Sequence, residues 1–118
     1  MKTTSQSFMN IKELQDIYLV TITNNNKINI LNSWAMESSL DRLLQKADKS
    51  IYIDLKNIQF IDSTGFRTLV KLNNTARTKN VKMFFFNFSE EAFELVDLLG
   101  LFNEFSILDR FNNLKKAS

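Results

Sequence analysis

The sequence predicts a single α/β domain over residues 1–118, with a mixed, mostly parallel sheet of four to five strands and about four helices. Three observations support this class. Segments rich in β-branched and aromatic residues alternate with amphipathic helical segments, which favours right-handed crossovers between strands. The chain has no proline and no low-complexity linker that would divide it. A short polar turn at residues 62–65 joins an apolar strand to a helix.

The first thirty residues predict an antiparallel hairpin. Residues 1–7 are polar, and we expect them to be flexible. Residues 8–14 alternate weakly between apolar and polar side chains, and a turn then leads to residues 17–23, which are rich in the β-branched residues typical of strands. A loop of three asparagines separates this hairpin from a short strand or extended segment at residues 27–31.

Three amphipathic helices are predicted next, each with its own start signal. The first begins at Asn32–Ser33, the second follows residues 62–65, and the third begins at Ser89, with acidic residues in its first turn, and ends at Gly100. The expected apolar faces are Trp34, Ala35, Leu40, Leu43, Leu44 and Ala47 in the first helix; Phe66, Leu69, Val70, Leu72 or Asn73, and Ala76 in the second; Phe93, Val96, Leu99 and Leu95 in the third.

Two further strands lie between these helices. Residues 50–55 form the strand before the polar turn, and residues 81–87 are apolar on both faces, as a central parallel strand is. We interpret the phenylalanines at 84–86 and 88 as core. A last strand at 105–108 and a terminal helix at 109–117 complete the predicted fold.

Composition excludes several classes of function. A net charge of +2 with scattered Lys and Arg does not favour nucleic-acid binding. The chain has no cysteine and no histidine, which removes disulfides, thiolate chemistry, the commonest metal ligand and the commonest general base. We therefore expect no enzyme activity, no cofactor and no metal site. The N-terminal residues do not have the pattern of a signal peptide, and no apolar run approaches the ~18–20 residues needed to cross a bilayer, so we expect a cytoplasmic protein.

The tetrapeptide Asp62-Ser63-Thr64-Gly65 is the most informative motif. It places two hydroxyls beside the unpaired N–H groups that begin a helix, where a phosphate is well accommodated. In the plainer interpretation, Asp62 or Ser63 only caps the helix, which contributes about 1 kcal/mol. Gly65 argues for a further role, because glycine early in a helix costs up to about 1 kcal/mol relative to alanine. It is explained if another surface approaches the backbone or if a kinase must reach Thr64.

These motifs resemble the STAS domain family, named for sulfate transporters and anti-sigma factor antagonists. The resemblance is carried by the strand at 51–55, by Phe60-Ile61-Asp62-Ser63-Thr64-Gly65 with the apolar positions after it, by residues 81–87 followed by Ser89, and by Leu98-Leu99-Gly100-Leu101 with Phe105. It covers the chain from about residue 17 onward. The region at 24–29 departs from the family pattern, which often has a glycine followed by a Leu-Asp pair there.

The resemblance implies a non-catalytic antagonist in a partner-switching circuit. In such antagonists the Ser or Thr before the glycine is phosphorylated by an anti-sigma factor that is also a serine/threonine kinase. The acceptor here would be Thr64, with Ser63 as the alternative, and the other implied partner is a serine/threonine phosphatase. The expected partner surface comprises Asp62, Ser63, Thr64, Gly65, Phe66, Asn32 and Ser33.

The sequence is also compatible with functions other than an anti-sigma factor antagonist. Stand-alone STAS proteins that brace the ATPase of a lipid-transport ABC complex also resemble this chain, and there the threonine turn is a contact. A homodimer is a further candidate, since an exposed apolar patch near Phe102 and Phe105 would favour self-association. For Asp62 the alternatives are a cap and a docking contact. Trp34 is expected to pack against the core rather than to anchor an interface.

Overall fold

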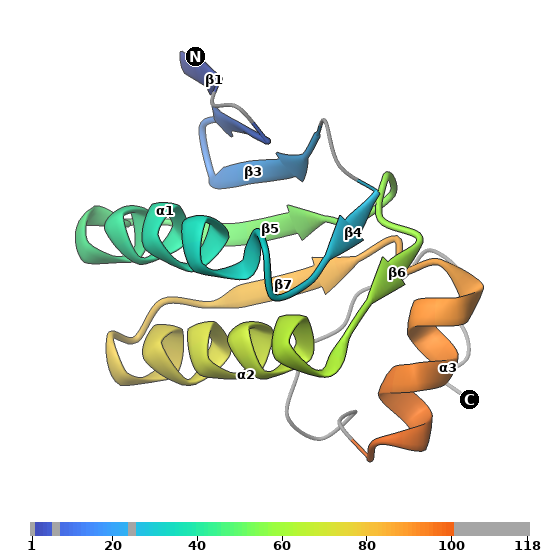
Figure 1. Cartoon of the computed structure of the whole chain (residues 1–118). Helices are drawn as coiled ribbons and strands as arrows, with labels where there is room; N and C mark the ends of the chain where they lie inside the picture. Colours follow the sequence, from blue (N-terminus) through green and yellow to red (C-terminus); the bar gives the residue numbers. More distant parts are fainter. Residues whose placement is uncertain (1, 6–7, 24–25, 101–118) are drawn as a thin grey trace, which may run out of the picture.

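The computed structural model describes residues 2–5, 8–23 and 26–100. A five-stranded sheet of order β1-β2-β3-β5-β7 is covered on one face by helices α1 and α2, which run side by side in the same direction (Figure 1). Helix α3 stands at the far end of the sheet, beside a small second sheet of β4 and β6. The predicted strand at 105–108 and helix at 109–117 lie outside the described residues.

The predicted hairpin is confirmed. Strands β2 (Met9–Glu13) and β3 (Ile17–Ile22) pair antiparallel, with Met9 opposite Ile22. The sequence predicted no element at residues 1–7, whereas β1 (Lys2–Ser5) pairs antiparallel with β2. Its Lys-Thr-Thr-Ser sequence has no apolar alternation, so only the exposed edge of β2 accounts for the strand.

The parallel half of the sheet contains β3, β5 (Ser50–Asp54) and β7 (Met83–Phe86). Side chains alternate along β7: Met83 and Phe85 are buried, whereas Phe84 and Phe86 are half-buried and lie against Tyr52. The prediction that both faces of this strand are apolar core therefore holds for one face only. Within the described residues β7 has a single neighbouring strand, β5.

The small second sheet fixes the position of the polar turn at residues 62–65. Strand β4 (Lys27–Ile28) pairs parallel with β6 (Phe60–Ile61), so that Ile28 stands opposite Ile61. Each strand leads within a few residues into a helix: α1 (Ser33–Lys46) after β4 and α2 (Ser63–Thr78) after β6. The starts of the two helices are thereby brought to the same end of the molecule (Figure 1).

One core lies between the sheet and the helices, and it corrects two assignments. Most predicted helix residues are buried as expected, including Leu40 and Leu43 on α1 and Leu69 on α2. Trp34, however, is 77% exposed, because it lies outside the buried face of α1, which begins with Ser33 and Met36. Leu99 follows the end of α3 (Glu90–Leu98) and is exposed, while Ala92 and Val96 supply the buried face of that helix.

The ends of α3 are as predicted. The Ser89 side chain accepts a hydrogen bond from the Ala92 N–H at 3.1 Å, and Gly100 adopts a φ of +69° just beyond the helix. A left-handed residue at this position is the usual way to end a helix, and glycine adopts it without strain. Among the described helices, none is long and apolar enough to cross a membrane.

Candidate functional site at the start of helix α2

Thr64 is the second residue of α2, and its side chain is partly exposed. Ser63, the first residue of the helix, is exposed. The sequence predicted two hydroxyls beside the opening N–H groups of a helix, and the structure places both residues in that first turn. Both lie at a surface where a second protein has access to them.

Asp62 is the N-cap of α2 and makes a second bond as well. Its Oδ1 accepts a hydrogen bond from the Gly65 N–H at 2.7 Å, which confirms the capping role. Its Oδ2 accepts a hydrogen bond from the N–H of Ile30 at 3.2 Å, and its own N–H donates to the Ile28 carbonyl at 3.0 Å. One carboxylate therefore joins the start of α2 to the segment that leads into α1.

Two backbone N–H groups in the first turn of α2 are available to donate hydrogen bonds to a ligand or partner. Among the described residues, none accepts a hydrogen bond from the backbone N–H of Ser63 or of Thr64. The next donor, the Gly65 N–H, is occupied by Asp62, and the Phe66 N–H is bonded to the Asp62 carbonyl at 2.9 Å. Open N–H groups at a helix start favour an anionic group, because the helix dipole adds to the attraction.

Gly65 is required by the fold itself. A Cβ at this position would lie 2.5 Å from the Ile28 carbonyl oxygen and 2.8 Å from Cγ2 of Ile61. The surface that approaches its backbone is therefore β4 of the same chain. From the sequence we expected either another surface close to this glycine or a kinase that must reach Thr64. The parallel pairing of β4 with β6 explains the residue without any partner.

The segment between β4 and α1 folds against this turn. The Asn32 side chain accepts from the Asn29 N–H at 3.0 Å and donates to the Lys27 carbonyl at 2.8 Å. The Asn29 side chain accepts from the Leu31 N–H at 2.9 Å. Asn32 therefore lies at the same end of the fold as Thr64, as predicted. Its side chain does not cap α1 but fixes the loop before it.

Three residues of the predicted partner surface are not at the surface. Phe66 is only 2% exposed and belongs to the core, and Ser33 is also buried. Gly65 is buried under β4. Their side chains cannot contact a partner directly in this structure. Asp62, Ser63, Thr64 and Asn32 remain as the accessible members of the predicted set.

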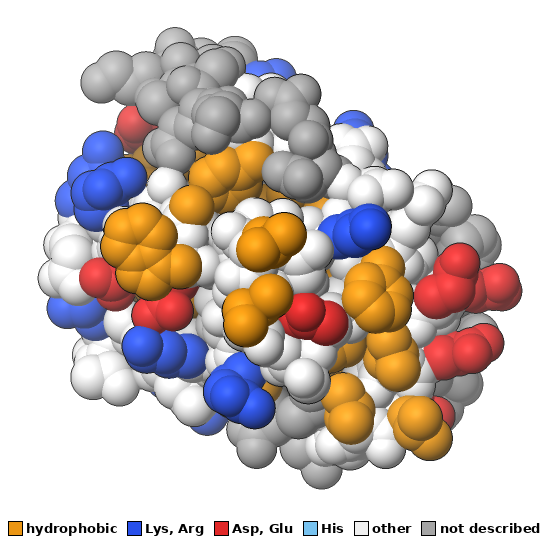
Figure 2. Space-filling view, viewed as in Figure 1, with side chains coloured by type: hydrophobic (Ala, Val, Ile, Leu, Met, Phe, Trp, Pro, Cys, Tyr) orange, Lys and Arg blue, Asp and Glu red, His pale blue; other side chains and the backbone are white. Residues whose placement is uncertain are grey.

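Sequence reasoning missed four exposed apolar side chains around the turn, which we call the apolar surface: Ile30, Leu31, Trp34 and Phe60. Their exposed fractions are 69%, 88%, 77% and 48%. Figure 2 views this side of the molecule, where hydrophobic side chains appear among charged ones. The available signal was the adjacent apolar pair Ile30-Leu31, which follows Asn29 beyond the end of β4 at Ile28.

Charged groups flank the same region. Lys27 and Arg67 are exposed, and neither forms a salt bridge within the described part of the chain. The Nζ of Lys71 lies 2.7 Å from Oε2 of Glu37 and ties α2 to α1. The hydrogen bond from Glu37 raises the pKa of Lys71 above its ordinary value, and the charge of Asp41 acts in the same direction. The carboxylates near α1 are thus partly compensated by Lys71, whereas Lys27 and Arg67 remain uncompensated.

Comparison with solved structures shows which proteins share this fold. An anti-sigma factor antagonist from Mycobacterium paratuberculosis superposes with a TM-score of 0.72 at 16% identity, covering 92% of this chain and 91% of that one. The unphosphorylated anti-sigma factor antagonist SpoIIAA gives 0.70 at 9% identity, covering 92% and 95%. SpoIIAA from Bacillus in its phosphorylated form gives 0.65 at 10% identity, covering 93% and 99%. Similarity at these identities shows the fold.

Family membership rests on the sequence model. No protein with a curated description matches the chain in sequence. The model of the STAS domain, however, matches residues 8–117, which is nearly the whole chain. The strand–turn–helix unit at residues 60–66 lies inside that range. This chain therefore belongs to the STAS domain family.

Proposed function

We propose that this chain is an anti-sigma factor antagonist in a partner-switching circuit. In its unmodified form it binds an anti-sigma factor that has serine/threonine kinase activity. Phosphorylation of Thr64 by that kinase releases the complex, and a serine/threonine phosphatase restores the binding form. The chain itself is a substrate in this cycle and not a catalyst.

The observation that carries this proposal is the position of Thr64. Its side chain is partly exposed in the first turn of α2, beside the open N–H groups of Ser63 and Thr64 itself. A phosphate adds about −1.5 to −2 charges at neutral pH. The helix start tolerates that charge, so we expect the fold to persist after modification. Phosphorylation then alters only the surface that a partner contacts.

A bound partner experiences the opposite effect. It has to make room for the phosphate, and it has to desolvate a dianion or face it with its own charges. We expect a loss of about 3–5 kcal/mol of binding free energy, which is roughly a hundred- to several-thousand-fold in affinity. A loss of this size is sufficient to exchange one partner for another.

A kinase reaction tests the proposal. The purified chain is incubated with the anti-sigma factor kinase of the same organism and ATP, and the modified residue is mapped by mass spectrometry. We expect one phosphate on Thr64, none on the Thr64→Val variant, and unchanged labelling of the Ser63→Ala variant. Labelling of Thr64→Val equal to that of the unaltered chain would contradict Thr64 as the acceptor, and labelling lost only in Ser63→Ala would move the site to Ser63.

A further inference from the structure

The apolar surface lies on segments that border the Thr64 turn. Ile30 and Leu31 lie in the loop that Asp62 holds, Trp34 lies in the first turn of α1, and Phe60 is on β6, two residues before Asp62. All four are substantially exposed. Single exposed apolar residues are ordinary, but several large ones around one turn indicate a surface that is covered in a complex.

The loop that carries this surface is held rigidly. Side-chain bonds from Asn29, Asn32 and Asp62 fix the loop N–H groups, and the Ser33 N–H donates to the Asn29 carbonyl at 2.8 Å. Apolar side chains that are already fixed in place lose less conformational entropy when a partner covers them. The loop is therefore built as a preorganised contact.

Positive charge borders the apolar surface. Lys27 stands opposite Phe60 in the pairing of β4 with β6. Arg67 follows Thr64 by three residues and so lies on the same face of α2. Glu37 and Lys71, about one turn further along α1 and α2 than Trp34 and Arg67, form an ion pair that joins the two helices.

We propose that this surface inserts Trp34, Leu31 and Ile30 into an apolar recess of the partner whose edge carries carboxylates. The carboxylates face Lys27 and Arg67, and the same groups accept hydrogen bonds from the open N–H groups of Ser63 and Thr64. This inference rests on the proposed function and specifies the partner of the same site: the anti-sigma factor kinase supplies the recess. Trp34 is the central anchor, since tryptophan side chains dominate such contacts.

The polar groups within the surface favour a protein as the occupant. Covering the open N–H groups of Ser63 and Thr64 with hydrocarbon would leave them without hydrogen-bond partners, which is costly. A bilayer interior offers none, whereas a protein can place acceptors there.

The same arrangement accounts for the effect of phosphorylation. A phosphate on Thr64 occupies the open N–H groups that the partner's carboxylates would use. It also places a dianion against those carboxylates, so attraction becomes repulsion. Asp62 bonds to both the Gly65 N–H and the Ile30 N–H, and therefore lies between the modified turn and the apolar loop.

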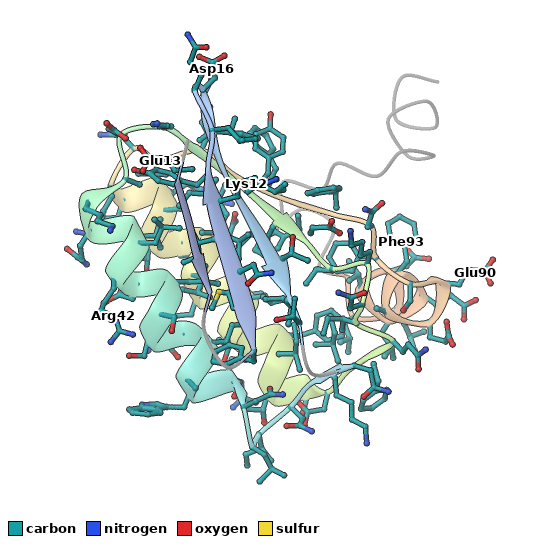
Figure 3. All side chains as sticks on the ribbon, turned by 90° about the horizontal axis from the view of Figure 1, so that it is seen from above. Lys12, Glu13, Asp16, Arg42, Glu90 and Phe93 are labelled. Carbon is teal, nitrogen blue, oxygen red and sulfur yellow. The ribbon has the colours of Figure 1, made fainter. Side chains whose placement is uncertain are left out.

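Binding measurements on matched variants test this inference. Dissociation constants for the purified kinase are measured by isothermal titration with the unaltered chain, with Trp34→Ala, with Lys27→Glu/Arg67→Glu, and with Leu98→Ala. Leu98 is a matched control because it is 81% exposed and lies on α3, which stands apart from α1 (Figure 3). Trp34 is the only tryptophan of the chain, so its fluorescence reports directly on whether it becomes covered.

We expect Trp34→Ala to weaken binding by about thirtyfold or more, as truncation of a central anchor does. The charge reversals should weaken binding most at low salt, Leu98→Ala should bind normally, and Trp34 emission should shift to shorter wavelength in the complex. Equal affinity of Trp34→Ala and the unaltered chain would overturn this inference and leave the proposed function intact. Failure of the unaltered chain to bind the kinase would overturn both.

Trp34 fluorescence also tests whether a second copy of the chain or a membrane covers the apolar surface. Trp34 emission is also measured as the chain alone is concentrated, and with vesicles of anionic phospholipid. We expect no shift in either titration. A shift with concentration would assign the surface to a second copy, and a shift with vesicles would assign it to a membrane; either result contradicts a protein recess.

Discussion

At the scale of single residues, the site depends on two side chains with different roles, those of Asp62 and Thr64. Asp62 caps α2 through Oδ1 and holds the Ile30 N–H through Oδ2, so it fixes the turn without offering a free carboxylate. Thr64 lies two residues later and keeps its side chain partly exposed. The residue that shapes the turn is therefore distinct from the residue proposed to carry the modification.

Gly65 gives a prediction at this scale. Alanine favours a helix over glycine by up to about 1 kcal/mol, but its Cβ would lie 2.5 Å from the backbone oxygen of Ile28. Because overpacking against backbone costs about 1–3 kcal/mol or more, we expect Gly65→Ala to lower the free energy of unfolding by about 1–2 kcal/mol. Urea denaturation measures the change.

Ser63→Ala provides the control for this substitution. Ser63 is in the same helical turn and is exposed, so its change should stay within about 0.5 kcal/mol. A Gly65→Ala variant as stable as Ser63→Ala would show that β4 can move away. The close approach would then not be the reason for the glycine.

The difference between sequence and structure is clearest at residues 60–65. The cap at Asp62 and the helix after it follow from local residue types, and both are correct. The need for glycine at position 65 could not be predicted from local residue types, because Ile28 becomes a neighbour of Gly65 only when β4 pairs with β6. Trp34 was assigned to the core as part of an apolar helical face, whereas the buried face of α1 begins with Ser33 and Met36, and residue type alone does not reveal that a serine occupies it.

At the scale of elements, the two-residue strands were the hardest to predict. Strands β4 and β6 are too short to show any periodicity, and their pairing is a tertiary contact. The longer elements were predicted because their patterns extend over several residues: β3 alternates between half-buried and buried positions, and α2 buries Phe66, Leu69, Leu72 and Ala76 at helical spacing. The predicted elements beyond residue 100 stay predictions.

The β2–β3 hairpin is fixed to β5 by a polar cluster. The Tyr18 hydroxyl donates to Asp48 at 3.1 Å, and Lys49 Nζ lies 2.8 Å from Glu13 Oε2 and 2.9 Å from the Leu14 carbonyl. Lys12, Glu13 and Asp16 are labelled on this hairpin in Figure 3. Burial raises the pKa of Tyr18, with Asp48 acting in the same direction, and the hydrogen bond to Glu13 raises the pKa of Lys49.

These raised pKa values predict a loss of stability at alkaline pH. Both groups bind their protons more tightly in the folded chain than in the unfolded chain. Their contribution is therefore complete below the ordinary pKa values of about 10 and is lost as pH rises through the folded values. We expect the urea midpoint to fall above about pH 10, and we expect Tyr18→Phe to reduce that fall because phenylalanine does not ionise.

The chain provides a matched control for the pH experiment. Its other tyrosine, Tyr52, lies against Phe84 on the opposite side of β5 from the buried Ile51 and Ile53. Tyr52→Phe should leave the alkaline fall as in the unaltered chain. An identical fall in Tyr18→Phe and the unaltered chain would show that the hairpin cluster does not control alkaline stability.

At the scale of the whole molecule, the fold brings the residues of the proposed site to one end. The starts of α1 and α2 lie near the small sheet (Figure 1), and Thr64, the apolar surface, Lys27 and Arg67 belong to those helix starts and to the segments that lead into them. The remaining end of the sheet is occupied by the polar cluster at Lys49 and Glu13. We therefore expect the proposed phosphate at Thr64 to change partner binding without disturbing the core.

The affinity of the purified kinase for the two forms of the chain tests the central claim most directly. The unmodified chain and the chain fully phosphorylated on Thr64 are titrated separately under the same conditions, with circular dichroism to compare their folds. We expect matching spectra and a dissociation constant that is roughly a hundredfold or more higher for the phosphorylated chain. Equal dissociation constants for the two forms would contradict the account.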